Sequence, residues 1–130
     1  MTLMAALPLA AGAAETRYEC RFKVGAARDG NAVPEILFVQ HAAGGDTALI
    51  FDPIIKHFIG KPIAAKFATE TKARVEFKWD VRVHNNSGQD FLMFYTFVYY
   101  KDGRPAKIVA APGGYDNRFS GEGTCKLSRG

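Results

Sequence analysis

The chain lacks the long apolar run that a membrane-spanning helix requires. No stretch of its 130 residues approaches the ~20 consecutive apolar residues of such a helix. We therefore predict no membrane span.

Spacings that indicate a metal site are also missing. The three histidines, His41, His57 and His84, fall on separate predicted elements and form no HxH, HExxH or Cys/His pattern. The glycine pairs at 44–45 and 113–114 lack the Lys-Ser/Thr of a phosphate-binding loop, which leaves them as turns. The sequence predicts neither a metal nor a cofactor.

No residue is marked as a catalytic nucleophile, because none of the serines considered (Ser87, Ser120 and Ser128) lies in a GxSxG context. Carboxylates could still meet in space, although no spacing selects them. The candidates are Asp80, Asp90, Asp102 and Asp116. We predict no catalytic residue, and an enzyme remains only an alternative.

Cysteine is scarce, with Cys20 near the start and Cys125 near the end. Two cysteines so far apart, with no CxxC motif, favour one disulfide in an oxidising compartment. Such a bond would close a loop of about 100 residues, for which chain entropy gives on the order of 4 to 5 kcal/mol as an upper figure.

The first 14 residues carry no charge and end in small residues, which is typical of the end of a secretory signal peptide. No Lys or Arg precedes the apolar part, which suggests a clipped or misplaced start; a buried N-terminal helix is the alternative. We expect a signal peptide over 1–14, a single β domain over 15–130, and a periplasmic or secreted location.

The net charge of +4 allows attraction to anionic partners. In the run from Arg74 to Arg82, however, basic and acidic residues alternate on the polar face, so neighbouring charges cancel. A nucleic-acid surface would need a stripe of one sign, and we predict no nucleic-acid partner.

Strand-like runs dominate the chain. Segment 74–84 alternates apolar and charged residues with a period of two, segment 91–100 follows after a polar loop, and the two together predict a long hairpin. Asp52, Pro53 and Gly60 predict one short helix over 53–59. Other strands are expected near 17–24, 36–40, 47–51, 63–67, 105–111 and 118–127. The predicted fold is all-β, a small antiparallel barrel or sandwich of about seven or eight strands with one helix and one disulfide.

Segment 91–100 is apolar or aromatic on both faces, while its partner strand has only one apolar face. One face is therefore surplus, and we interpret it as a recognition surface; a strand buried on both sides is the alternative. The sequence does not say which of the two faces is buried. The candidate binding residues are Tyr95, Tyr99, Tyr100, Arg104 and Tyr115.

Three segments carry a resemblance: Tyr18-Glu-Cys20, the central 52–63, and the end Gly114-Tyr-Asp-Asn-Arg-Phe-Ser-Gly-Glu-Gly-Thr-Cys125. Together they resemble a group of small exported bacterial proteins of unknown function. The opening alone is also similar to the periplasmic C-type lysozyme inhibitors, small disulfide-bearing β-barrels that block a hydrolase. The chain has no recognisable counterpart to their later inhibitory segment, so that role is an analogy.

These observations favour an exported, non-enzymatic β domain that binds a protein or an envelope component, with an inhibitor-like binder as one form. A carrier of a small apolar ligand inside the barrel, capped by the 53–59 helix, is the first alternative, and a small hydrolase with carboxylates assembled in space is the second. An enclosed apolar cavity would favour the carrier, clustered carboxylates the hydrolase, and a filled interior with an exposed aromatic patch the binder.

Overall fold

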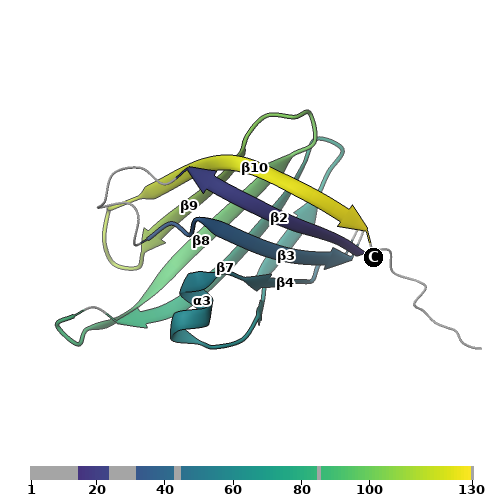
Figure 1. Cartoon of the computed structure of the whole chain (residues 1–130). Helices are drawn as coiled ribbons and strands as arrows, with labels where there is room; N and C mark the ends of the chain where they lie inside the picture. Colours follow the sequence, from purple (N-terminus) through teal and green to yellow (C-terminus); the bar gives the residue numbers. More distant parts are fainter. Residues whose placement is uncertain (1–14, 24–31, 43–44, 85, 130) are drawn as a thin grey trace, which may run out of the picture.

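The computed structural model describes residues 15–23, 32–42, 45–84 and 86–129, and the predicted signal peptide lies outside these ranges (Figure 1). The described residues form nine strands and one helix. In chain order they are β2 (Glu15–Lys23), β3 (Ile36–Ala42), β4 (Ala48–Phe51), α3 (Pro53–Phe58), β5 (Ile63–Ala64), β6 (Phe67–Glu70), β7 (Arg74–His84), β8 (Asp90–Tyr100), β9 (Ala106–Pro112) and β10 (Phe119–Arg129). The all-β prediction is confirmed, with nine strands rather than seven or eight.

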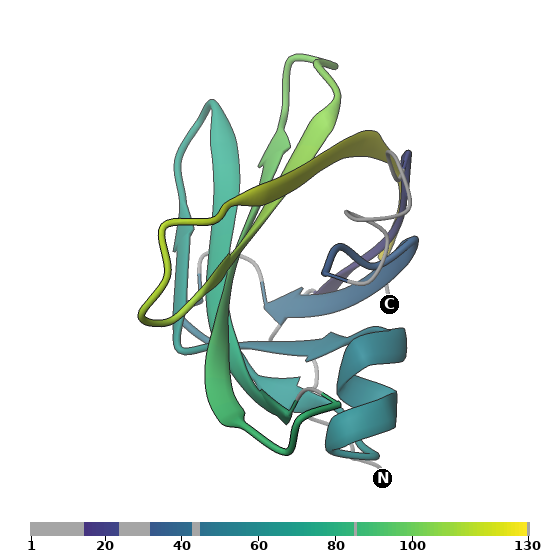
Figure 2. The same cartoon turned by 90° about the vertical axis from the view of Figure 1, so that its left-hand side faces the viewer.

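The strands of the described chain lie in one antiparallel sheet with the order β5-β4-β3-β2-β10-β9-β8-β7-β6. The first and last of these strands in sequence, β2 and β10, are therefore neighbours in the middle of the sheet. The sheet curls into a half-barrel, which Figure 2 shows from the end where α3 lies. Of the two predicted architectures, the fold is thus barrel-like and not a two-sheet sandwich.

The extra strand arises where one strand was predicted over 63–67. There the chain leaves one edge of the sheet and joins the other. The backbone N–H of Ala65 donates to Ala48 on β4, and the N–H of Lys66 donates to Lys78 on β7. Consecutive residues thus bond to opposite edges, which divides the segment into the short strands β5 and β6.

The short helix α3 begins as predicted and ends one residue earlier, at Phe58, with Ile59 as its C-cap. Asp52 is its N-cap and accepts a 2.7 Å hydrogen bond from the backbone N–H of Ile55, and Pro53 occupies the first turn. Gly60 follows the helix with φ of +92°, a conformation that a side chain disfavours. Figure 1 places α3 at the same end of the half-barrel as the β7–β8 loop.

The predicted disulfide is present and joins the two central strands. Cys20 on β2 lies directly opposite Cys125 on β10, with 3.9 Å between their Cα atoms. Cys20 is fully buried, as its place on the apolar face of its strand predicts. The bond therefore ties together the strands nearest the two ends of the described chain.

Aromatic rings from β7 and β8 fill the interior. In the β7–β8 register Trp79 faces Tyr95 and Phe77 faces Phe97, and both pairs of rings are stacked. Tyr18 of β2 packs edge-on against Phe77, which joins the two halves of the curled sheet. The concave side of the half-barrel is thus a packed core.

Candidate functional site

The five predicted binding residues do not share one face. Tyr95 is buried and its hydroxyl donates a 2.9 Å hydrogen bond to the carbonyl of Ala32. Tyr99 packs edge-on against Tyr18 inside the half-barrel. Both rings belong to the core, so the proposed exposed face through Tyr95 and Tyr99 is wrong.

The register of β7 and β8 explains this correction. Directly opposed residues of an antiparallel pair lie on the same face of the sheet. The apolar residues of β7 face the core, and Val75 and Trp79 are opposite Tyr99 and Tyr95. Of the two orientations that the sequence left open, the structure has the one that buries the odd-numbered residues of β8.

Of the other three candidates, which are at the surface, Tyr100 and Arg104 lie together and Tyr115 lies apart from them. Tyr100 faces outward at the end of β8, where the Arg104 guanidinium carbon is 4.4 Å from its ring centroid. Arg104 also bonds Asp102 at 2.9 Å in the β8–β9 turn. Tyr115 is 57% exposed in the β9–β10 loop, beyond the opposite end of β8, and packs against Phe91. Their role in binding stays a prediction.

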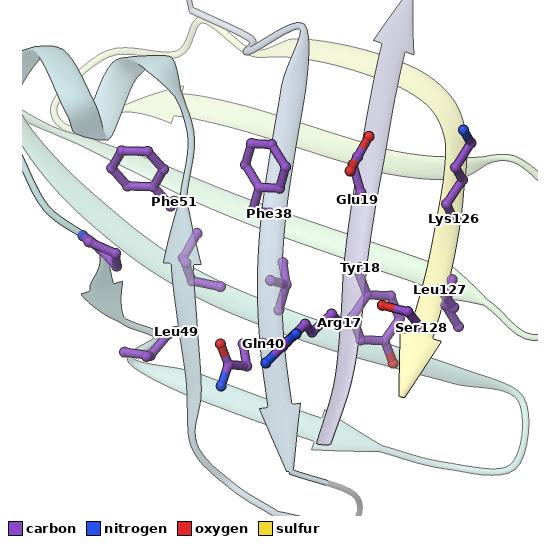
Figure 3. A pocket seen from close by; sticks show the side chains of 13 residues that line it. Arg17, Tyr18, Glu19, Phe38, Gln40, Leu49, Phe51, Lys126, Leu127 and Ser128 are labelled. Carbon is purple, nitrogen blue, oxygen red and sulfur yellow. The ribbon is translucent and has the colours of Figure 1, made fainter. Parts of the chain in front are cut away.

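A better candidate lies on the convex face of the sheet, over β4, β3, β2 and β10. There a hollow of about 620 Å³ is open to solvent. We call it the outer cleft, and Figure 3 shows its side chains in two rows across the strands. One row consists of Phe51, Phe38, Glu19 and Lys126, and the other of Leu49, Gln40, Arg17 and Ser128.

The β4–β3 half of the outer cleft is apolar. Phe38 is 40% exposed and Leu49 is 48% exposed, while Phe51 is half-buried. Strand pairing places Phe38 directly opposite Phe51, so the two rings adjoin on one face. Large apolar side chains clustered on an exposed face are typical of an interaction surface.

The β2–β10 half of the outer cleft is charged, with both signs present. Arg17 and Lys126 contribute positive charge, and Glu19 lies beside Lys126 in the same row. A guanidinium nitrogen of Arg21 is 3.8 Å from a carboxylate oxygen of Glu19, and both side chains are exposed. An exposed pair at this distance contributes little to stability, so these charges remain available to a partner.

The sequence also carries a signal for this surface, in the segments that form β3 and β4. The runs around Leu37-Phe38 and Leu49-Ile50-Phe51 are apolar on both faces of short strands, as in segment 91–100. In the structure Leu37 and Ile50 point into the core, which leaves the alternate residues outside. Apolar residues on both faces of a strand therefore predict an exposed apolar face at the outer cleft as well as at β8.

Buried polar groups lie near α3. Asp52 is 1% exposed; its Oδ1 caps the helix, whereas its Oδ2 has no hydrogen-bond partner among the described residues. Burial raises the pKa of the Asp52 carboxyl from 3.8 to about 6, against the lowering effect of backbone N–H bonds from Ile55 and Ile54. The indole N–H of Trp79 is a second buried polar atom without a partner in the described chain.

The buried side chain of His41 makes contacts that join strands of the sheet. Its Nε2 is 2.8 Å from the carbonyl of Gly45, and its Nδ1 is 3.9 Å from a carboxylate oxygen of Glu70. Lys101 binds the other oxygen of Glu70 at 2.7 Å. This chain of contacts ties β3 to β6 and to the end of β8.

Two of the four carboxylates that were candidates for a hydrolase site, Asp90 and Asp102, lie at opposite ends of β8. Asp90 begins that strand and Asp102 follows its far end, so the length of the strand separates them. Within the described ranges, no group of three or more His, Cys, Asp or Glu is placed to hold a metal ion.

The fold and the surface define a small disulfide-bonded β domain with a filled core and an exposed cleft that is apolar on one half and charged on the other. A disulfide indicates a compartment outside the reducing cytoplasm. No helix among the described residues has both the length and the apolar character needed to cross a bilayer. No family model, curated protein or solved structure matches the chain.

Proposed function

We propose that this protein is an exported, non-enzymatic β domain that binds a partner protein through the outer cleft. The observation that carries the proposal is the exposed cluster of Phe38, Leu49 and Phe51 beside charged residues of β2 and β10. An apolar centre with a polar, charged rim is the usual anatomy of a protein-binding surface. Export is supported by the signal-like start and the disulfide, with the periplasm or the extracellular space as the location.

The packed interior favours this function over the carrier. Trp79, Phe77 and Phe97 occupy the space in which a barrel carrier would hold its ligand. No observation favours the hydrolase. An inhibitor of a hydrolase remains one specific form of the binder, and it rests on the similarity of the opening segment to C-type lysozyme inhibitors.

The test compares two double variants in a pull-down from envelope extract. Phe38→Ser with Leu49→Ser removes the two most exposed side chains of the apolar half of the cleft. The matched control, Phe67→Ser with Phe94→Ser, removes two large apolar side chains of similar exposure from β6 and β8. Both doubles should retain stability within about 1 to 2 kcal/mol, because the replaced side chains are exposed.

The proposal expects the first double to lose the partner and the control to keep it. Loss in the control alone would move the binding face to β6 and β8, and capture by both variants would refute the outer cleft. The inhibitor form has its own assay, the rate of cell-wall lysis by a C-type lysozyme with and without the protein. An unchanged rate at a large excess of protein would refute that form and leave the binder intact.

A further inference from the structure

A second hollow lies at the end of the half-barrel, apart from the outer cleft. It measures about 960 Å³, near the upper end of the 300–1,000 Å³ typical of small-molecule sites. Helix α3 forms one side and the β9–β10 loop the other, with the adjoining ends of β7 and β8 between them. Figure 2 looks into this end of the molecule. We call this hollow the end groove.

Aromatic rings come to the end groove from four separate parts of the chain. Phe58 belongs to α3, Phe91 to β8, Tyr115 to the β9–β10 loop and Phe119 to β10. The Phe91 and Tyr115 rings lie 6.3 Å apart in an edge-on arrangement. Because each ring is held on a different element, the groove offers several apolar surfaces in fixed positions.

The polar groups that accompany these rings are two amides, two imidazoles and the hydroxyl of Tyr95, which already donates to the carbonyl of Ala32. Asn86 and Asn117 each offer a carbonyl acceptor and an amide donor. His57 and His84 both pack edge-on with Phe58, with ring centroids 4.7 Å and 5.4 Å from it. Each imidazole can donate or accept a hydrogen bond.

The end groove has no Asp, Glu, Lys or Arg among the described residues that line it. This is unusual in a chain of which 23% is charged, and the outer cleft by contrast contains Arg17, Glu19 and Lys126. An anionic lipid or an acidic glycan would require a cationic partner to offset the loss of hydration on binding. The composition of the groove therefore favours a ligand without charge.

We infer that the end groove binds a neutral carbohydrate, a short oligosaccharide. Such a ligand has apolar C–H faces that pack on aromatic rings, and hydroxyls that both donate and accept hydrogen bonds. Phe91 and Tyr115 supply the rings on which the C–H faces would pack. Asn117 and the imidazoles supply hydrogen-bond partners for the hydroxyls. A purely apolar chain would leave those amides and imidazoles without bonds to the ligand, which makes a lipid the weaker match.

The experiment titrates the protein with chitotriose, cellotriose and maltotriose, each up to about 10 mM, and measures calorimetric heats and backbone amide shifts. The proposal expects at least one trisaccharide to bind, with the largest shifts at Tyr115, Asn117 and Phe119. The uncharged alcohol 1-octanol is titrated in parallel as the apolar probe.

Variants separate the groove from the rest of the surface. Tyr115→Ala should weaken sugar binding about tenfold, because it removes a stacking ring, whereas Tyr115→Phe should keep it within about threefold. Phe67→Ala, on β6, is the matched control for loss of an exposed ring and should leave the affinity unchanged. The double Phe38→Ser, Leu49→Ser should also bind sugar normally, so this test is independent of the outer cleft.

Three results would overturn the inference. The first is that none of the three sugars shifts a groove residue at about 10 mM. The second is that 1-octanol binds and the sugars do not, which would make the groove a lipid site. The third is that Tyr115→Ala weakens binding no more than Phe67→Ala does, which would place the sugar elsewhere.

Discussion

Replacement of Asp52 by Asn tests whether the buried, ionised carboxylate of Asp52 lowers the free energy of unfolding. The Asp52 side chain is 1% exposed and only one of its oxygens is bonded, by the N–H of Ile55. Asn is as good an N-cap as Asp, because it keeps an oxygen that accepts this bond. The substitution therefore removes the ionisation and leaves the helix cap in place.

The direction of the effect follows from the pKa of the Asp52 carboxyl, which burial raises to about 6 from an ordinary 3.8. The folded state holds this proton more tightly than the unfolded state does. Ionisation of Asp52 therefore costs stability above pH 6, and the cost disappears as the pH falls towards 3.8. At 1.36 kcal/mol per pKa unit, the full cost is about 3 kcal/mol.

The assay is urea unfolding at pH 7.5, 6 and 4, followed by the fluorescence of Trp79, the single tryptophan of the chain. The Asn variant should be more stable than the wild type by up to about 3 kcal/mol at pH 7.5, with the difference shrinking to near zero at pH 4. If the Asn variant is less stable than the wild type by the same amount at every pH, the carboxylate carries no cost and the reasoning is refuted.

Asp102→Asn is the control for general effects of losing a carboxylate. Asp102 is exposed, and hydrogen bonds from the backbone and side chain of Arg104 hold the pKa of its carboxyl below the ordinary value. A lowered pKa means that ionised Asp102 favours the folded state, and that this contribution is lost as the pH falls. The control should thus show a small pH dependence of the opposite sign.

Two further predictions concern the framework. Replacing Cys20 and Cys125 together by Ala should lower the free energy of unfolding by about 4 kcal/mol in urea, because the bond closes a loop spanning 105 residues; a change below about 1 kcal/mol would contradict the loop-entropy argument. Gly123→Ala should prevent folding as judged by near-ultraviolet circular dichroism, because its Cβ would lie 2.7 Å from the carbonyl carbon of Arg21. Gly60→Ala is the matched control: its Cβ meets no atom within 4 Å, so only the φ of +92° costs stability, about 1 kcal/mol, and equal effects of the two substitutions would contradict both explanations.

Local sequence was sufficient to predict the features that depend on residues close together in the sequence. The alternation in 74–84 predicted which side of β7 is buried, because successive side chains of a strand point to opposite faces. Asp52, Pro53 and Gly60 predicted α3, because they match the backbone requirements at the two ends of a helix. The scarcity and separation of Cys20 and Cys125 were enough to predict their bond.

Tertiary structure decided what local pattern leaves open. A strand that is apolar on both faces, such as β8, has no internal sign of which face is buried, and only its pairing with β7 turned Tyr95 inward. The curl of the sheet likewise divided 63–70 between two edges and left Phe38 and Leu49 outside the core. The end groove depends most on the fold, because Phe58 and Tyr115 are far apart in sequence and come to one hollow only when the half-barrel forms.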